Sequence, residues 1–115
     1  MKIYKGSKKL QQNRWEQTKA EAQLTEAQQN VNVAVTAAYI KYQEAITQNE
    51  TLKTNRDLAN ENYRIMESKY NHQLAILLDL IDASNAKLDA ELQFANSEIT
   101  MVNAYYKLLK ETGTL

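Results

Sequence analysis

Apolar side chains recur along most of this chain at alternating steps of three and four residues, which is the period of a coiled coil. The first such series runs from Leu24 to Tyr70, and most of its positions are apolar. Its members are Leu24, Gln28, Val31, Val35, Ala38, Tyr42, Ala45, Asn49, Leu52, Arg56, Ala59, Tyr63, Met66 and Tyr70. This series predicts one long helix over residues 8–70.

A second series with the same period begins directly after the first. It comprises Leu74, Leu78, Ile81, Asn85, Leu88, Leu92, Ala95, Ile99, Val102, Tyr106 and Leu109. This series predicts a second helix over residues 74–112. Gly113 follows it, and glycine commonly ends a helix because it adopts the left-handed conformation at little cost.

The two series mirror one another about His72, which predicts an antiparallel hairpin with its tip at residues 71–73. The facing pairs expected from this mirror include Tyr63 with Ile81, Arg56 with Leu88, and Asn49 with Ala95. Two unrelated seams would fall into such a register about one time in seven, because their period is seven residues. The fold class expected is therefore all-α, a long antiparallel two-helix coiled coil.

The second helix carries another apolar stripe on nearly the opposite face. Its members are Ile76, Leu80, Ala83, Lys87, Ala90, Phe94, Ser97, Met101, Ala104 and Leu108. A helix that is apolar on two faces is buried on two sides. We expect the first series to contact the hairpin partner and this second stripe to contact a further helix, with its small residues allowing close approach. Such a hairpin is one element of a larger helical wall.

The beginning of the chain is expected to be a short lead-in, with Gly6 and Ser7 as pre-helix and N-cap residues. At 1.5 Å per residue, the first helix would span about 90 Å and the second about 58 Å. The part of the first helix before Leu24 is more polar and contains Trp15, the only tryptophan. It would extend beyond its partner, so we expect another structure to cover it.

Composition agrees with a few long helices in a single domain. The 115 residues include no proline, two glycines and no cysteine, so helix breakers are nearly absent and disulfides are excluded. Charged residues are balanced at a net charge of zero, which gives no support for a nucleic-acid partner. The chain lacks an apolar run of about 18 residues, and its basic N-terminus lacks the apolar core of a signal peptide. We therefore expect either an exported protein without its signal or a piece of a longer protein.

Candidate chemistry is sparse. His72 is the only histidine and falls in the predicted turn, where a solvated turn residue is the usual role. No second metal ligand lies at helical spacing from it, and the chain has neither a serine–histidine–acid set nor a glycine-rich phosphate loop. We expect no enzyme activity, no cofactor and no metal.

An ordered set of short motifs nevertheless resembles a known family. The lead-in is Ile3–Gly6, the tip is Lys69–Leu74, the acidic segment is Leu78–Ala83 (LDLIDA), and the close is Leu108–Leu115 (LLKETGTL). In order and spacing, this set resembles the TolC-like family of outer-membrane efflux proteins over nearly the whole chain. It is similar to the second, C-terminal, of the two helical hairpins that form the family's periplasmic tunnel.

The resemblance implies a function in export. The family forms homotrimeric channels with a barrel in the outer membrane and an α-barrel through the periplasm of the Gram-negative cell envelope. Each channel works with a periplasmic adaptor (membrane fusion) protein and an inner-membrane transporter to export small molecules or proteins. The chain would then be a fragment of a larger outer-membrane channel protein, forming a tunnel segment that does not itself span the membrane.

The resemblance also implies roles for residues near the tip. Asp79 and Asp82 match acidic residues that ring the closed periplasmic aperture, and Tyr70 matches a tyrosine that helps to hold it shut. The tip that contacts the adaptor would comprise His72, Gln73, Leu74 and Ala75. Without the resemblance, the helix dipole is the better explanation of the two aspartates, because it favours acids in the first turns of a helix, and the two explanations are compatible.

Two departures from the family pattern concern this tip. The family usually has glycine where Gln73 stands, so we expect the turn to be made differently, with Asn71 in the left-handed conformation. Some members have an arginine in the gating network where this chain has Ala75. The latch that closes the aperture is therefore expected to differ in detail.

Two other classes of protein fit the helical pattern. One is a free-standing structural coiled-coil module that acts as a spacer or dimerises. The other is the hairpin of a periplasmic adaptor, which is also a long antiparallel coiled coil. Adaptor hairpins are flanked by lipoyl-like β segments, whereas this chain has Ile-Tyr-Lys-Gly near its start and Gly-Thr-Leu at its end. These ends favour the channel.

Overall fold

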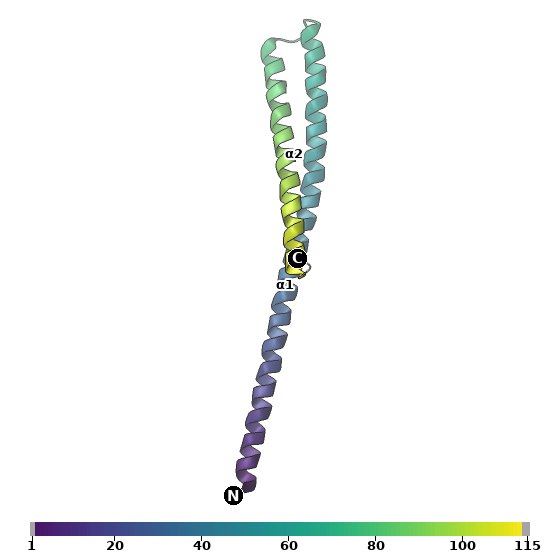
Figure 1. Ribbon diagram of the computed structural model, residues 1–115. Helices are drawn as coiled ribbons and strands as arrows, with labels where there is room; N and C mark the ends of the chain where they lie inside the picture. The colour runs from purple at the N-terminus through teal and green to yellow at the C-terminus, as the bar shows by residue number, and fades with distance from the viewer. Residues whose placement is uncertain (1, 114–115) are drawn as a thin grey trace. The chain divides into compact units, whose positions relative to one another are not determined.

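The computed structural model describes residues 2–113, with side chains from residue 9 onward. It contains helix α1, Lys2–Asn71, and helix α2, Leu77–Glu111 (Figure 1). The described residues include no strand. The prediction of an all-α, two-helix hairpin is confirmed. The last two residues of the Gly-Thr-Leu close, Thr114 and Leu115, lie outside the described range.

The chain divides into two compact units, the first ending at Ala37 and the second beginning at Ala38. The first unit is part of α1 alone, and its described large apolar side chains are exposed except for the half-buried Val35. Trp15 is 65% exposed, and the Nζ of Lys19 lies 5.4 Å from the centre of its ring. A covering structure for this unit therefore stays a prediction.

The second unit is the hairpin, in which residues 38–71 of α1 lie antiparallel to α2 (Figure 1). Within this unit α1 buries the series that the sequence predicts. The members that are buried or half-buried are Ala38, Tyr42, Ala45, Asn49, Leu52, Arg56, Ala59, Tyr63 and Met66. The α1 side of the hairpin was therefore predicted correctly.

The prediction for α2 is wrong, because the two apolar stripes are exchanged. The stripe that contacts α1, here called the inner stripe, is buried or half-buried at Leu80, Ala83, Lys87, Ala90, Phe94, Ser97, Met101, Ala104 and Leu108. The stripe expected to contact α1, here called the outer stripe, is exposed at Leu78, Ile81, Asn85, Leu88, Leu92, Ala95, Ile99, Val102 and Tyr106. The side of α2 that lacks a partner in this chain is therefore its bulkier apolar side.

The length of the connection explains the exchange. The helices are joined by five residues, 72–76, whereas the mirror pattern predicted three, 71–73. The two stripes of α2 are offset from one another by two residues, so a connection two residues longer brings the other stripe toward α1. The inner stripe also has a small residue at every seventh position from Ala83 to Ala104, which permits close packing of the two helices.

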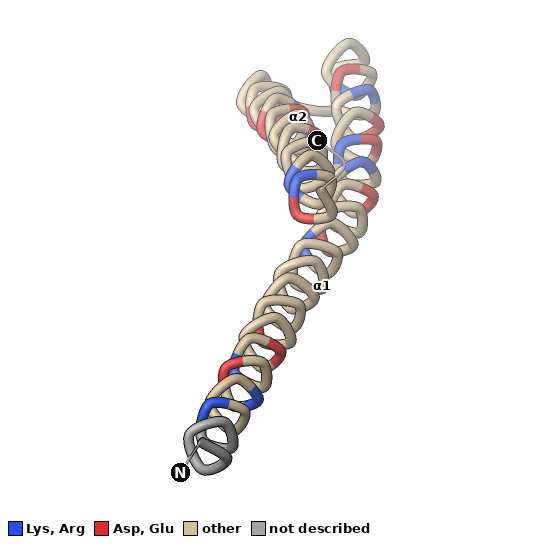
Figure 2. Tube along the Cα trace, turned by 60° about the horizontal axis from the view of Figure 1, so that its bottom comes forward, with Lys and Arg blue, Asp and Glu red and all other residues tan. Residues whose placement is uncertain are grey.

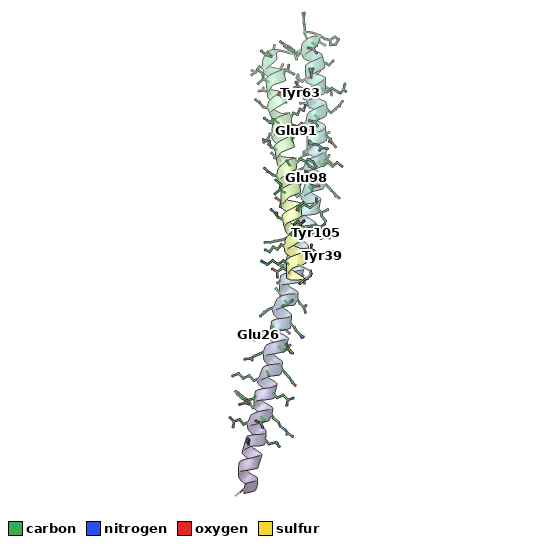
Figure 3. All side chains as sticks on the ribbon, in the orientation of Figure 1. Glu26, Tyr39, Tyr63, Glu91, Glu98 and Tyr105 are labelled. Carbon is green, nitrogen blue, oxygen red and sulfur yellow. The ribbon has the colours of Figure 1, made fainter. Side chains whose placement is uncertain are left out.

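Contacts across the hairpin replace the predicted facing pairs. Asn49 meets Ser97 instead of Ala95, since its Nδ2 donates a hydrogen bond to the Ser97 Oγ at 3.1 Å. The Arg56 guanidinium lies 4.4 Å from the centre of the Phe94 ring instead of contacting Leu88. The Tyr63 ring lies 4.8 Å from the Nζ of Lys87 (Figure 3) instead of facing Ile81.

Several helix ends also differ from the prediction. α1 begins by Lys2, so Gly6 and Ser7 are helical and form no lead-in or N-cap. One interior glycine costs a helix only about 1 kcal/mol, which the long continuous helix tolerates. α2 ends at Glu111 with Thr112 as its C-cap, and Gly113 has a φ of 77°, which confirms the left-handed conformation predicted for it.

The core of the hairpin is thin. Among the described side chains, only those of Ala38, Ala45, Ala83 and Ser97 are buried, and all four are small. A helix pair with so little buried apolar surface gains little stability from its own packing. The hairpin therefore depends on polar contacts for its register and has large apolar residues available for other partners.

Candidate functional site

The tip of the hairpin is the first candidate site, and its turn is made by Gln73. The amide N of Leu74 donates to the Lys69 carbonyl at 2.7 Å, and that of Gln73 donates to the Tyr70 carbonyl at 3.0 Å. These two bonds form a Schellman motif, which requires a left-handed residue at its centre. Gln73 has a φ of 61°, so glutamine adopts the conformation that the sequence analysis assigned to Asn71. That assignment is wrong, and Asn71 is the last residue of α1.

The start of α2 is capped by Asp79. Ile76 stands at the N-cap, where its hydrocarbon side chain accepts no hydrogen bond. The Asp79 carboxylate lies at the third helical position and accepts a hydrogen bond from the Ile76 amide at 3.3 Å. An acid in the first turn also interacts favourably with the helix dipole. One of the two proposed aperture acids therefore has a structural role that is compatible with exposure to solvent.

His72 and Tyr70 occupy the end of α1. The His72 Nδ1 lies 2.7 Å from the Ser68 carbonyl, and since a carbonyl only accepts, this nitrogen carries the proton. The same carbonyl also accepts the His72 backbone amide at 3.1 Å, so the ring adds a second hydrogen bond to it, and His72 remains exposed, as expected for a turn residue. Tyr70 is 38% exposed, and its hydroxyl has no hydrogen-bond partner among the described residues.

The connection presents apolar surface to solvent. Leu74 is 77% exposed, Ile76 is 63% exposed, and Ala75 between them is half-buried. The structure therefore brings the four predicted docking residues, 72–75, together in one connection. Ile76 belongs with them, but the sequence analysis placed it on a helix.

Acidic residues dominate α2 beyond its cap. From Leu77 to Tyr106 the helix contains five acidic residues and Lys87 as its only cation: Asp79, Asp82, Asp89, Glu91 and Glu98. None of these acids forms an ion pair within the described part of the chain. In Figure 2 acidic and basic residues are interspersed along the tip half of α1.

Glu61 and Arg64 form an exposed, hydrogen-bonded pair on α1. A hydrogen bond from Arg64 lowers the pKa of Glu61 below its ordinary value of 4.5, and the same bond raises the pKa of Arg64. Both groups are fully exposed, so they serve the surface of α1 and indicate no catalytic site.

The hairpin also has a shallow groove of about 330 Å³ on one side. It is lined by Ala45, Gln48, Leu52, Gln93, Asn96, Ser97 and Thr100. None of these side chains titrates near neutral pH, so the groove offers no general acid or base. Within residues 2–113 no group of three or more histidines or acids is placed to hold a metal ion.

Two cation–aromatic contacts across the hairpin were not predicted from the sequence. Arg56 and Tyr63 are seven residues apart on α1, and Lys87 and Phe94 are seven residues apart on α2. In an antiparallel pair this equal spacing brings each cation over the ring of the other helix. Matching cation–aromatic spacings were a usable signal, but it required the correct stripe of α2.

Neither helix, over its described residues, has the length and apolar character needed to cross a bilayer. Neither the comparison with curated proteins nor that with solved structures returned a significant match. A family model, described as outer membrane efflux protein, matches residues 5–114. This is a channel and transport family that is not known for enzymatic activity, and its members generally trimerise and work with adaptor and transporter partners. The match covers nearly the whole chain, and the chain therefore belongs to the outer membrane efflux protein family.

Proposed function

We propose that this hairpin is a wall segment of the periplasmic α-barrel in a homotrimeric outer-membrane channel. The channel would export small molecules or proteins together with a periplasmic adaptor and an inner-membrane transporter. The observation that carries the proposal is the family match over residues 5–114, and the antiparallel hairpin agrees with it. The chain would be the tunnel part of a larger protein.

Burial within the hairpin supports a role in a wall. α2 contacts α1 through a stripe with a small residue at every seventh position, and it exposes a bulkier apolar stripe on its other side. An isolated two-helix protein rarely exposes a continuous apolar stripe, whereas an element of an assembly does so at each interface. The alternatives, a free-standing coiled coil or an adaptor hairpin, are disfavoured because the family match is to the channel.

The tip residues would act at the periplasmic aperture. Asp79 and Asp82 lie in the first two turns of α2, are exposed, and have no ion-pair partner among the described residues. In a trimer each would form a ring of three negative charges, which attracts cations and repels itself. The unpartnered Tyr70 hydroxyl would hydrogen-bond across the closed aperture.

The connection would contact the adaptor. Its residues His72, Gln73, Leu74 and Ala75 form a turn held by backbone hydrogen bonds, so its shape is fixed before a partner arrives. The exposed Leu74 side chain is the apolar anchor expected at the centre of such a contact. A preformed turn with one protruding apolar residue suits docking against a matching hollow.

The aperture role is tested in the full-length channel by planar-bilayer conductance. Asp79→Asn with Asp82→Asn removes both charges, while the side-chain amide oxygen introduced at position 79 can still accept the capping bond from the Ile76 amide. We expect a lower resting conductance to cations and weaker block by multivalent cations, because the rings of negative charge that attract cations are gone. Glu50→Gln is the matched control, because Glu50 is an exposed acid remote from the tip and free of ion pairs in the described structure.

If conductance and cation block are unchanged in the double variant, neither aspartate acts at the aperture. An equal change in the Glu50→Gln control would show that overall charge, and not the proposed rings, controls conductance. Loss of the trimer in the double variant would assign the aspartates to assembly instead.

A further inference from the structure

The outer stripe of α2 has the dimensions of a helix-packing seam. Its large apolar members are between 45% and 59% exposed: Leu78, Ile81, Leu88, Leu92, Ile99, Val102 and Tyr106. Together they expose roughly 700 Å², more than most monomeric proteins leave open and close to one side of a standard protein interface. The steps of three and four residues persist over 78–106, which is about 43 Å of helix. A seam of this period fits another helix in coiled-coil packing.

Acidic residues border this seam on both edges. Asp82 follows Ile81 and Asp89 follows Leu88 on one edge, while Glu91 precedes Leu92 and Glu98 precedes Ile99 on the other. Figure 3 labels Glu91 and Glu98 on α2. In the described structure these four acids form no ion pair, and the only hydrogen bond to their carboxylates is from the Gln93 amide to Asp89 at 2.8 Å, so no cation neutralises them.

No cation of α2 offsets these edges between Leu77 and Tyr106. Lys87 is the only basic residue of that segment, and it lies on the inner stripe with its Nζ over the Tyr63 ring of α1. Residues that flank a coiled-coil seam meet those flanking the partner seam, and there they set partner choice through charge. An antiparallel second copy of this stripe would place acids against acids, such as Glu91 against Glu98, and a parallel copy would bring two acidic edges together with no cation to offset them.

We propose that the outer stripe of α2 binds a helix whose apolar heptad seam is edged by lysine and arginine, and that its acidic edges exclude a second copy of itself. The binding preference itself does not depend on the wall-segment proposal. That proposal is needed only for the expectation that the bound helix is another part of the channel. In the channel wall, the two helices at this contact would then carry opposite charges along the edges of their seams. The chain uses the same residues to attract one partner and to reject the other.

The test uses the 115-residue chain and two synthetic amphipathic helices of about four heptads with identical leucine and isoleucine seams. One peptide has lysine at every flanking position and the other has glutamate. Fluorescence anisotropy at about 50 mM salt should show the lysine-edged peptide binding about tenfold more tightly or better, and about 1 M salt should remove the difference. Equal binding of the two peptides would overturn the proposal.

Paired variants locate the contact. Leu88→Gln with Ile99→Gln should abolish binding of the lysine-edged peptide, because both residues lie on the outer stripe. Leu58→Gln with Ile65→Gln is the matched control, since these exposed apolar residues belong to α1 and not to the stripe. Binding that survives the first pair, or is lost equally in the control, would place the contact elsewhere.

A third variant tests exclusion of a second copy. Asp89→Asn, Glu91→Gln and Glu98→Gln together remove edge charges and leave the proposed aperture residue Asp82 in place. Sedimentation equilibrium should show this variant self-associating at least about tenfold more tightly than the unchanged chain. Equal self-association would show that the acids do not select the partner. None of these experiments measures channel conductance. A negative result here would therefore leave the proposed aperture role of the aspartates untouched, and a negative conductance result would leave this inference untouched.

Discussion

Gln73 offers the sharpest test of how the tip turn is built. Its φ of 61° lies in the left-handed region, which costs an L-residue about 1–2 kcal/mol relative to glycine. Gln73→Gly removes that cost but gives the unfolded chain more freedom, which offsets about 0.4–1 kcal/mol. The side chain of Gln73 is exposed and makes no hydrogen bond in the described structure, so little else is lost. The hairpin should gain about 0.5–1 kcal/mol, since the first effect is the larger.

The gain is measured by thermal unfolding followed by circular dichroism at the helical signal. For a cooperative unit of this size, a stabilisation of about 0.5–1 kcal/mol raises the Tm by roughly 2–8 °C. Gln73→Ala should change the Tm little, because alanine has the same steric problem as glutamine. Gln73→Val should lower it, since a β-branched residue is least tolerated at positive φ.

Ala75→Gly is the matched control in the same connection. Ala75 is not among the residues with positive φ, so glycine there removes no strain and only loosens the unfolded chain. It should leave the Tm unchanged or lower it slightly. A Gln73→Gly variant that is no more stable than the original chain, or a Gln73→Val variant as stable as the original, would refute the left-handed turn at this position.

Two further predictions concern packing within the hairpin. Ala83→Leu should destabilise the hairpin by about 1–3 kcal/mol in the same unfolding assay, because Ala83 is 5% exposed and packs against α1. Ala95→Leu, on the exposed outer stripe, should be nearly neutral. If Ala95→Leu were the more destabilising of the two, the outer stripe would be the one that contacts α1. Ser97→Ala should lower the free energy of unfolding in denaturant by about 1–3 kcal/mol, since it leaves the part-buried Asn49 amide without its acceptor. Adding Asn49→Ala should recover part of that loss. Additive losses in the double variant would show that the two residues do not interact.

The sequence predicted α1 better than α2 for a physical reason. Within the hairpin α1 has a single continuous apolar series, so its buried face follows from the period alone. α2 has two such series, and both fit a hairpin. The choice between them depends on the number of residues in the connection, and a difference of two residues reverses the result.

The connection was difficult to predict because its usual signals are absent. The family glycine is replaced by Gln73, and the N-cap of α2 is Ile76, whose side chain is not one of those that normally mark a helix start. Gly113 shows the contrast, since a glycine beyond the last seam residue correctly predicted the left-handed end of α2. The position of the candidate tip residues was therefore predictable from the pattern, whereas the geometry that presents them was not.

The exchange of stripes links the stability of the hairpin to assembly. By placing Ala83, Ala90, Ser97 and Ala104 against α1, α2 brings the helices close but buries little apolar surface, and most of its leucines and isoleucines are exposed. Most of the burial available to α2 must therefore come from a neighbouring helix. A partner that binds only the folded hairpin stabilises it by mass action, so an unpaired hairpin is the least stable form of this element. Acidic edges then have a clear benefit, because they keep this open stripe from pairing with its own copies before the correct neighbour binds.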